Sequence, residues 1–310
     1  MNKSINTASG PLTIPLTNDY LFRALLQQNN KVHKCLIGSL LHLSLEKIVS
    51  VEITNPIELG KSFEAKDFFL DIKVLLNSDT VINLEMQAVN EHNWPERSLS
   101  YLCRSFDSLN RGDNYLEAKP VIQTSLLDFT LFPDYPEFYA TYKLLNVKNC
   151  IKYSDDICLH VLDLTHTDLA TDEDRIFQID YWAALFKATT WEELRMLAEK
   201  NESIAEATET VYKLSEEEMI RLQCEAREDY YRRQRDVQLQ LEWAREDYYR
   251  RKRDAEILMK RALKREQEAL QQKQAAELQA QELTKQVQEL TKQVAHLTAE
   301  LEESGAKQTK

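Results

Sequence analysis

The pattern of apolar and polar positions over the first two thirds of the chain predicts alternating helices and strands. Apolar residues recur at helical spacing in two early segments, 18–28 and 31–43. Shorter β-prone apolar runs predict strands in the order 47–54, 68–74, 81–87, 120–129, 137–145 and 157–164. Pro95 is expected to start a further helix that reaches about residue 110 and that Gly112 stops. The order of helix, three strands, helix and strand indicates an α/β core.

Helical periodicity continues through 172–213, and neither proline nor glycine occurs from 215 to about 303. As one helix this last segment would extend over roughly 130 Å. The heptad 281–287 is repeated verbatim at 288–294, and apolar residues fill two seam positions along it: Ala280, Leu283, Val287, Leu290, Val294, Leu297 and Leu301. The pattern predicts a coiled coil, and its weakly charged flanks favour a homodimer. We expect the segment after 215 to be dispensable for any chemistry.

A second repeat precedes the heptads. The residues at 226–236 return at 244–254 with a single change, from Gln234 to Lys252. Tyrosines and arginines that alternate in this way could hold phosphates and stack on bases. They could equally form a solvent-exposed helix whose charges pair four residues apart, as in Glu228–Arg232, Asp229–Arg233, Glu246–Arg250 and Asp247–Arg251. Such pairing would use much of the positive charge, so the sequence favours the exposed helix.

Polar side chains interrupt the two apolar runs that the turn cluster at 77–79 joins into a predicted hairpin. Side chains alternate between the faces of a strand, so Glu85 and Gln87 share a face, as do Asp71 and Lys73. A buried charge is costly unless it pairs or binds a metal ion. Asp71, Glu85 and the main-chain carbonyl of Met86 could therefore bind Mg²⁺ or another divalent cation through oxygen atoms. The alternative is that both acids are solvated residues of an edge strand.

The spacing Asp71-(x)13-Glu85-x-Gln87 resembles the core of the PD-(D/E)XK nucleases. Further segments in the same order make the chain similar to the Rpn family, the recombination-promoting nucleases also described as transposases: 17–22, 97–101, 112–122 and 126–129. The resemblance covers residues 13–200 and implies an αβββαβ core with a mixed sheet flanked by helices. It also implies a Mg²⁺-dependent DNA endonuclease with little sequence specificity that promotes DNA recombination.

The resemblance assigns roles to the polar residues of the hairpin. Asp71, Glu85 and Met86 would be the metal-binding residues. Gln87 stands where most of the superfamily carries lysine, although the Rpn pattern itself has glutamine there. An amide can replace the lysine cation only weakly, so Lys73 is a candidate for the missing charge. It could also be an ordinary surface lysine.

Residues outside the hairpin are candidates for binding DNA. Arg97 matches the family pattern and, beside Tyr101, could grip phosphates. Lys119 precedes a proline and is either a phosphate contact or a turn residue. Asp19 lies where the superfamily sometimes adds an acidic ligand, but we expect it to be a capping residue for the turn at Asn18. Either Asn18 or Thr17 can cap the first helix.

Composition restricts the other possibilities. The formal charge is −12, yet residues 221–265 are net positive, so an acidic total does not exclude DNA. The five cysteines include no C-x-x-C pair, as expected of reduced thiols in the cytoplasm. No apolar run approaches the length of a membrane span. The absence of a glycine-rich phosphate loop argues against a nucleotide cofactor.

The predicted organisation is a flexible N-terminal arm (1–15), a nuclease-like domain (16–165), a helical extension (166–214), a long helix or coiled coil (215–303) and a disordered tail (304–310). A second function remains open. Gln87 and the large helical arm would also suit a catalytically weak or inactive nuclease fold that serves as a coiled-coil interaction or DNA-binding module.

Overall fold

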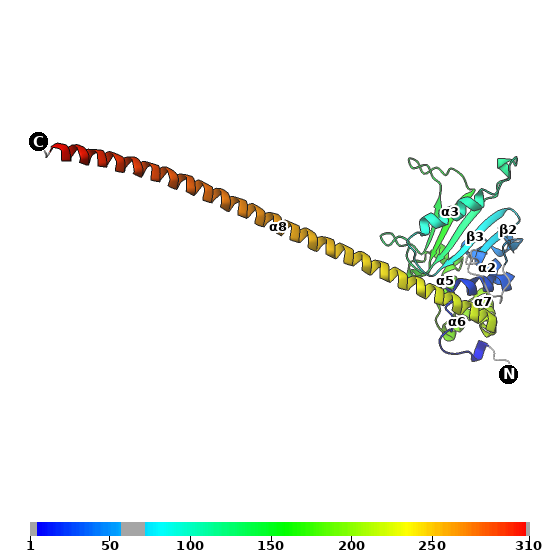
Figure 1. The fold of residues 1–310 in the computed structure, drawn as a ribbon. Coiled ribbons are helices and arrows are strands. Elements are labelled where there is room, and N and C mark those ends of the chain that lie inside the picture. Colours follow the sequence, from blue (N-terminus) through cyan, green and yellow to red (C-terminus); the bar gives the residue numbers. More distant parts are fainter. Residues whose placement is uncertain (1–4, 57–71, 308–310) are drawn as a thin grey trace. The chain divides into compact units, whose positions relative to one another are not determined.

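The computed structural model describes residues 5–56 and 72–307 (Figure 1). Asp71 and the apolar residues 68–70 before it lie outside the described part of the chain. The chain forms two compact units, Met1–Asp236 and Val237–Lys310. The first unit is a mixed α/β structure, and the second consists of a long helix.

A mixed six-stranded sheet in the described part of the first unit has the order β1-β2-β3-β4-β6-β5. β3, β4 and β6 are parallel to one another, whereas the remaining neighbours pair antiparallel. The strands are β1 (Val51–Ile53), β2 (Ile72–Leu76), β3 (Thr80–Gln87), β4 (Val121–Leu127), β5 (Tyr139–Lys143) and β6 (Ile157–Asp163). A strand is therefore present in each segment where the sequence predicts one; β1, β4, β5 and β6 are shorter than predicted, whereas β2 continues to Leu76 and β3 begins at Thr80.

The turn between β2 and β3 fixes the register of the predicted hairpin. Asn77 and Ser78 both have positive φ, 50° and 65°, which suits the tight turns that join twisted antiparallel strands. The Asn77 side chain also accepts a hydrogen bond from the main-chain N–H of Val49 at 2.7 Å, which ties this turn to the chain before β1. Ile72 consequently pairs with Leu84, and Lys73 pairs with Asn83.

The helices follow the sequence signals at their ends in most cases. Asn18 caps the first helix, as predicted, by accepting from the N–H of Leu21 at 3.1 Å, and Thr190 forms a capping box with Glu193. The helices are α1 (Asp19–Gln28), α2 (Asn30–Leu40), α3 (Trp94–Phe106), α4 (Asp172–Ile176), α5 (Ile179–Lys187), α6 (Trp191–Ala198), α7 (Glu202–Glu216) and α8 (Glu218–Lys307). The predicted end of α3 near residue 110 is wrong, because the N–H of Asp107 closes its last turn on Cys103.

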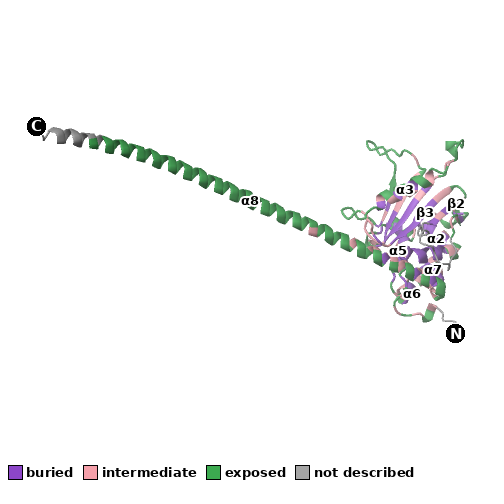
Figure 2. Ribbon diagram, in the orientation of Figure 1, coloured by how far each residue is buried: buried purple, intermediate pink, exposed green. Residues whose placement is uncertain are grey.

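Helices cover both faces of the sheet, which is buried at its centre (Figure 2). One face presents Ile82, Leu84 and Met86 of β3 to the main core, to which α1, α2, α5, α6 and α7 also contribute. The opposite face lies under α3, which contacts β3, β4 and β6. Trp94 of α3 packs there against Leu127 and Val161. The polar side of β3 therefore lies between the sheet and α3.

The start of the long helix α8 belongs to the first unit. α7 ends at Glu216, and Glu217 adopts an extended conformation before α8 begins at Glu218. Ile220, Cys224 and Tyr231 are buried, and the first two join the main core. The first turns of α8 therefore contribute to the core of the first unit, and the dispensability of the segment after 215 for the chemistry stays a prediction.

Candidate active site

Three polar residues of β3 lie on the side of the sheet that faces α3. The amide of Asn83 donates to Ser105 of α3 at 2.8 Å, and Glu85 accepts from Arg97 of α3. Gln87 follows at the same alternate spacing, so it shares this face. Glu85 is 5% exposed and Gln87 is 6% exposed, so neither is a solvated edge residue. β3 also lies between β2 and β4, in the interior of the sheet.

Arg97 is the direct partner of Glu85. Its Nη2 donates to Oε1 of Glu85 at 2.8 Å, and its Nη1 lies 3.6 Å from Oε2 of Glu91. The guanidinium also lies over the rings of Trp94 and Tyr101, 5.6 Å from each centroid. Burial lowers the pKa of Arg97, but the charges of Glu85, Tyr101 and Glu91 outweigh this effect and raise it. A charged arginine is thus fixed beside the buried carboxylate.

Local sequence explains why Arg97 reaches this position. α3 begins at Trp94 with Pro95 in its first turn, where a proline lacks no hydrogen bond that the helix would make. Arg97 follows within that turn, and its N–H donates to Asn93 at 3.0 Å. The helix therefore starts only a few residues after β3 ends at Gln87 and returns across that strand.

A row of polar side chains crosses the sheet at Asn83, two residues before Glu85 on β3. Lys73, Asn83 and Gln123 are register partners on neighbouring strands, so Lys73 lies on the Glu85 side of the sheet. Oδ1 of Asn83 and both amide atoms of Gln123 are buried without a hydrogen-bond partner among the described residues. The sequence reasoning missed Asn83 and Gln123. Asn83 precedes Glu85 by two residues on β3, and Gln123 precedes Ser125 by two residues on β4. Residues two apart share a face of a strand, and this was the signal that could have identified them.

The donor chemistry of this face suits a hard divalent cation. Glu85 offers a carboxylate, Gln87 an amide oxygen and Met86 its main-chain carbonyl, all oxygen ligands of the kind that Mg²⁺ accepts. No group of three or more His, Cys, Asp or Glu side chains is placed to hold a metal ion within 5–56 and 72–307. Asp71, the second carboxylate that the sequence predicts, lies outside those ranges.

The structure places one of the two other predicted DNA contacts beside Arg97. Tyr101 lies against Arg97, on the same helix. Lys119 instead donates from Nζ to the main-chain oxygen of Ser78, at 3.1 Å, in the β2–β3 turn. Ser78 precedes β3, whereas Glu85 lies near the far end of that strand, about 20 Å away along an extended chain. Lys119 thus holds a turn, and its contact with DNA stays a prediction.

A second buried ion pair lies at the start of α1. Nε of Arg227 donates to both carboxylate oxygens of Asp19 at 2.8 Å, and Nδ2 of Asn18 donates to Glu228 at 2.8 Å. Burial lowers the pKa of Arg227, but its hydrogen bond and charge interaction with Asp19 raise it well above the ordinary value. Asp19 is therefore an ion-pair partner, and the predicted capping role is wrong. The side of the first Tyr-Arg repeat that carries Arg227 docks on α1, so the predicted exposed helix is wrong for that side, whereas Arg232, Arg233 and Arg235 are exposed as predicted.

The mixed sheet with this polar face is compatible with the fold of the PD-(D/E)XK nucleases. The sequence model of the PD-(D/E)XK nuclease family transposases matches residues 16–242, and the chain belongs to this family. No match was found among curated proteins or among solved structures. The matched segment contains Asp71, Glu85, Gln87 and Arg97. Over the described residues, every helix is too short or too polar to cross a membrane.

Proposed function

We propose that this protein is a Mg²⁺-dependent DNA endonuclease with little sequence specificity. The observation that carries the proposal is the buried carboxylate of Glu85 on the polar side of β3, paired with Arg97 inside a nuclease-family domain. Such a carboxylate is expensive to bury without a functional or structural partner. A buried acid on the polar side of a strand is therefore a candidate for a functional group.

Asp71, Glu85 and the carbonyl of Met86 would hold the cation. Asp71 is next in sequence to Ile72, and Glu85 is next to Leu84, and these two neighbours are register partners across the hairpin. This adjacency supports the assignment of both acids to one site. A bound divalent cation activates water as a nucleophile and stabilises negative charge on the scissile phosphate.

The positive charge of this site has to come from a residue other than Gln87. Its amide can orient a water molecule or a phosphate oxygen by hydrogen bonding, but it carries no charge. Arg97 is already adjacent to Glu85, and Lys73 lies on the same side of the sheet. We assign Arg97 to phosphate positioning, because its planar guanidinium can bind a phosphate while it remains near Glu85. Lys73 is the candidate for the catalytic cation.

The heptads of α8 would join two chains. Leu283, Val287, Leu290, Val294 and Leu297 are each more than half exposed in the single chain. A lone helix cannot bury such a stripe. Valine at one seam position and leucine at the other favours a coiled coil of two parallel helices. A homodimer would carry two active sites, one for each strand of a duplex, and its cuts in cytoplasmic DNA would provoke recombination.

The competing function is a nuclease fold that binds DNA or protein partners without cutting. Gln87 in place of a catalytic lysine, together with the neutralisation of Glu85 by Arg97, favours it. A plasmid-nicking assay with and without Mg²⁺ separates the two functions. The endonuclease requires cleavage that Mg²⁺ supports and that Asp71→Ala removes, whereas the non-catalytic protein gives equal background in both samples.

A further inference from the structure

The two Tyr-Arg repeats of α8 differ at a single residue but have different surroundings. In the first copy (226–236), Arg227 pairs with Asp19 and Tyr231 is 4% exposed. The equivalent residues of the second copy (244–254) are Arg245 and Tyr249. Tyr249 is 49% exposed, and the guanidinium of Arg245 lies over its ring at 5.9 Å. A side-chain set that docks in one copy is thus presented to solvent in the other.

Residues around the second copy make it unsuited to the acceptor on α1. The counterpart of the buried Cys224 is Glu242, and the counterpart of the buried Ile220 is Gln238. Burial, followed by the charges of Asp19, Glu228 and Glu225, raises the pKa of the Cys224 thiol to about 12. A glutamate placed there would be a buried charge beside other carboxylates, which is strongly unfavourable. The second copy therefore requires a different partner.

The charges of the second copy are divided between two sides of the helix. Asp247 accepts from Arg250 and lies 2.6 Å from Nε of Arg251, so the charges of these two arginines are largely neutralised locally. Arg245, Lys252 and Arg253 have no acidic side chain within ion-pair distance over the described part of the chain. Three cations thus remain for an external partner.

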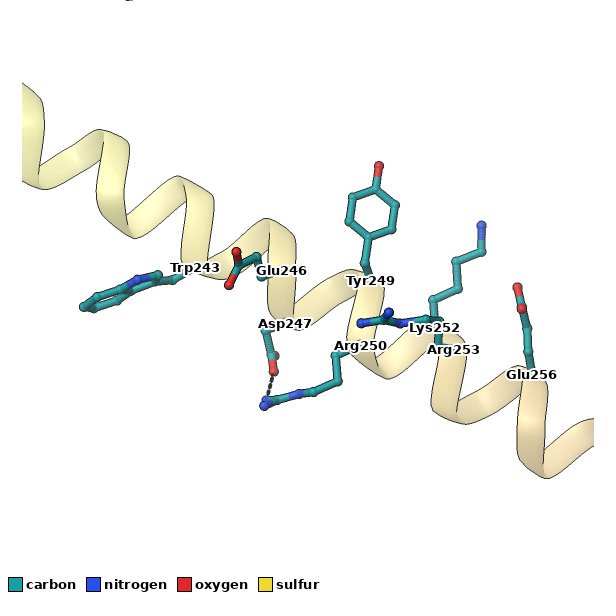
Figure 3. A pocket seen from close by; sticks show the side chains of 8 residues that line it. All are labelled: Trp243, Glu246, Asp247, Tyr249, Arg250, Lys252, Arg253 and Glu256. Carbon is teal, nitrogen blue, oxygen red and sulfur yellow. Dashed lines mark hydrogen bonds and ion pairs between the residues drawn. The ribbon is translucent and has the colours of Figure 1, made fainter. Parts of the chain in front are cut away.

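Those cations gather around Tyr249. Arg245 precedes Tyr249 by four residues, and Lys252 and Arg253 follow it by three and four, which places all of them on one helical face. Figure 3 shows Tyr249 and Lys252 extending to the same side of the helix, away from the Asp247–Arg250 pair. Lys252 is also the one residue that differs between the copies, where the docked copy has Gln234. The change adds a positive charge to the face that docks in the first copy and is exposed in the second.

We infer that the face formed by Arg245, Tyr249, Lys252 and Arg253 binds the phosphate backbone of DNA. The inference rests on the proposed function for the choice of DNA as the polyanion. Exposed cations that flank an aromatic ring match a nucleic-acid backbone, because they neutralise phosphates while the ring stacks on a base or sugar. The face lies beyond residue 242, where the match to the nuclease family ends, so it is a DNA contact added to the catalytic domain.

The test measures the affinity of the full-length protein for a short fluorescein-labelled duplex by anisotropy, in EDTA, over a series of salt concentrations. The variant combines Arg245→Gln, Lys252→Gln and Arg253→Gln. Its matched control combines Lys273→Gln, Lys285→Gln and Lys292→Gln, which removes the same charge from the same helix. We expect the variant to bind the duplex at least about tenfold more weakly at low salt. The slope of log K against log salt should become shallower by about two to three, because fewer phosphates are neutralised. The control should change affinity less than about twofold.

A gain of affinity provides an independent check. Glu256 lines the same groove as Tyr249, Lys252 and Arg253 and is one of the acids there, with Glu246 and Asp247, that oppose phosphate binding. Glu256→Gln should therefore tighten DNA binding about two- to fivefold. Tyr249→Ala should weaken it, whereas Tyr249→Phe should retain it, because the ring and not the hydroxyl stacks.

Three results would overturn the inference. The first is equal weakening in the triple variant and its lysine control, which would show that only net charge matters. The second is unchanged affinity in the triple variant. The third is a change in the oligomeric mass of the triple variant in solution, with unchanged affinity for DNA, which would make this face a protein interface.

The outcome is separable from that of the nuclease proposal. Asp71→Ala should keep full affinity for the duplex, since the assay needs no cleavage. Normal DNA affinity with no Mg²⁺-dependent nicking would defeat the nuclease proposal alone.

Discussion

Nη2 of Arg97, on α3, donates to Oε1 of Glu85, on β3, at 2.8 Å. The pair joins the helix to the sheet at the place where the family's chemistry is expected. An arginine that neutralises a buried carboxylate stabilises the folded chain, but it also competes with any cation that the carboxylate binds. Arg97 is therefore expected to affect both the affinity for the metal ion and the handling of phosphate.

Replacement of Arg97 by glutamine should separate these two effects. The loss of its charge leaves Glu85 more attractive to a cation, so Mg²⁺ should raise the melting temperature at concentrations about three- to tenfold lower. DNA nicking should nevertheless fall at least about tenfold, because the phosphate loses a positioning charge. Arg104→Gln, at an exposed position of the same helix, is the control and should resemble wild type. An Arg97 variant with unchanged Mg²⁺ dependence and unchanged nicking would contradict this role.

Gln87→Lys should keep or raise nuclease activity, because it restores a cation on the side of β3 that carries Glu85. If Lys73 supplies that charge in the natural protein, Lys73→Ala should reduce nicking at least about tenfold in wild type and less than about threefold in the Gln87→Lys background. Initial nicking rates of the four proteins form the double-mutant cycle. Equal losses in both backgrounds would show that Lys73 is not the catalytic cation.

Two truncations should behave differently. A chain that ends at residue 236 keeps Ile220, Cys224 and Tyr231 in place, so it should fold and be monomeric. It should still cut single-stranded or nicked DNA, with reduced double-strand cutting. A chain that ends at residue 214 loses these buried side chains and should be destabilised by several kcal/mol. Sedimentation and thermal unfolding measure both. A dimer formed by the 236-residue chain would contradict assembly through the heptads.

Stability should fall in mildly acidic solution through two buried histidines. Burial lowers the pKa of His33 and His160 from 6.5 to about 4. The unfolded chain therefore binds protons between pH 6.5 and 4 that the folded chain does not, so the contribution is complete above pH 6.5 and lost as the pH falls towards 4. The ring of His160 hydrogen-bonds the side chains of Tyr139 and Cys158.

His33→Leu isolates one of these contributions. Between pH 7 and pH 5 its free energy of unfolding should fall about 2 kcal/mol less than that of wild type, because one buried histidine no longer titrates. Urea denaturation at a fixed protein concentration measures the difference. His92→Asn, at an exposed site with positive φ that asparagine tolerates, should follow wild type. Parallel curves for wild type and His33→Leu would contradict the burial effect.

Local signals were sufficient for most of the fold. The cap at Asn18, the turn at Asn77 and the alternation through Glu85 and Gln87 depend on residues close in sequence, so each could be predicted. The end of α3 could not, because apolar periodicity continues beyond Phe106 without showing where the chain turns.

Contacts between distant segments were not predictable in the same way. Asp19 and Arg227 are 208 residues apart, and no periodicity connects them. The two Tyr-Arg copies are nearly identical, so their sequence alone could not show that one docks and the other is exposed. The Arg97–Glu85 contact required knowledge of how α3 crosses β3, although both residues were recognised as candidates.

The most direct test of the central claim compares Mg²⁺-dependent nicking of supercoiled plasmid by wild type, Asp71→Ala and Glu85→Gln, purified in parallel. Glutamine at position 85 still accepts the hydrogen bond from Arg97, so loss of activity cannot be assigned to loss of that contact. We predict cleavage by wild type that EDTA abolishes, and rates at least about 100-fold lower in both variants, equivalent to about 3 kcal/mol of transition-state stabilisation. Equal nicking by all three folded proteins would contradict the assignment of this site.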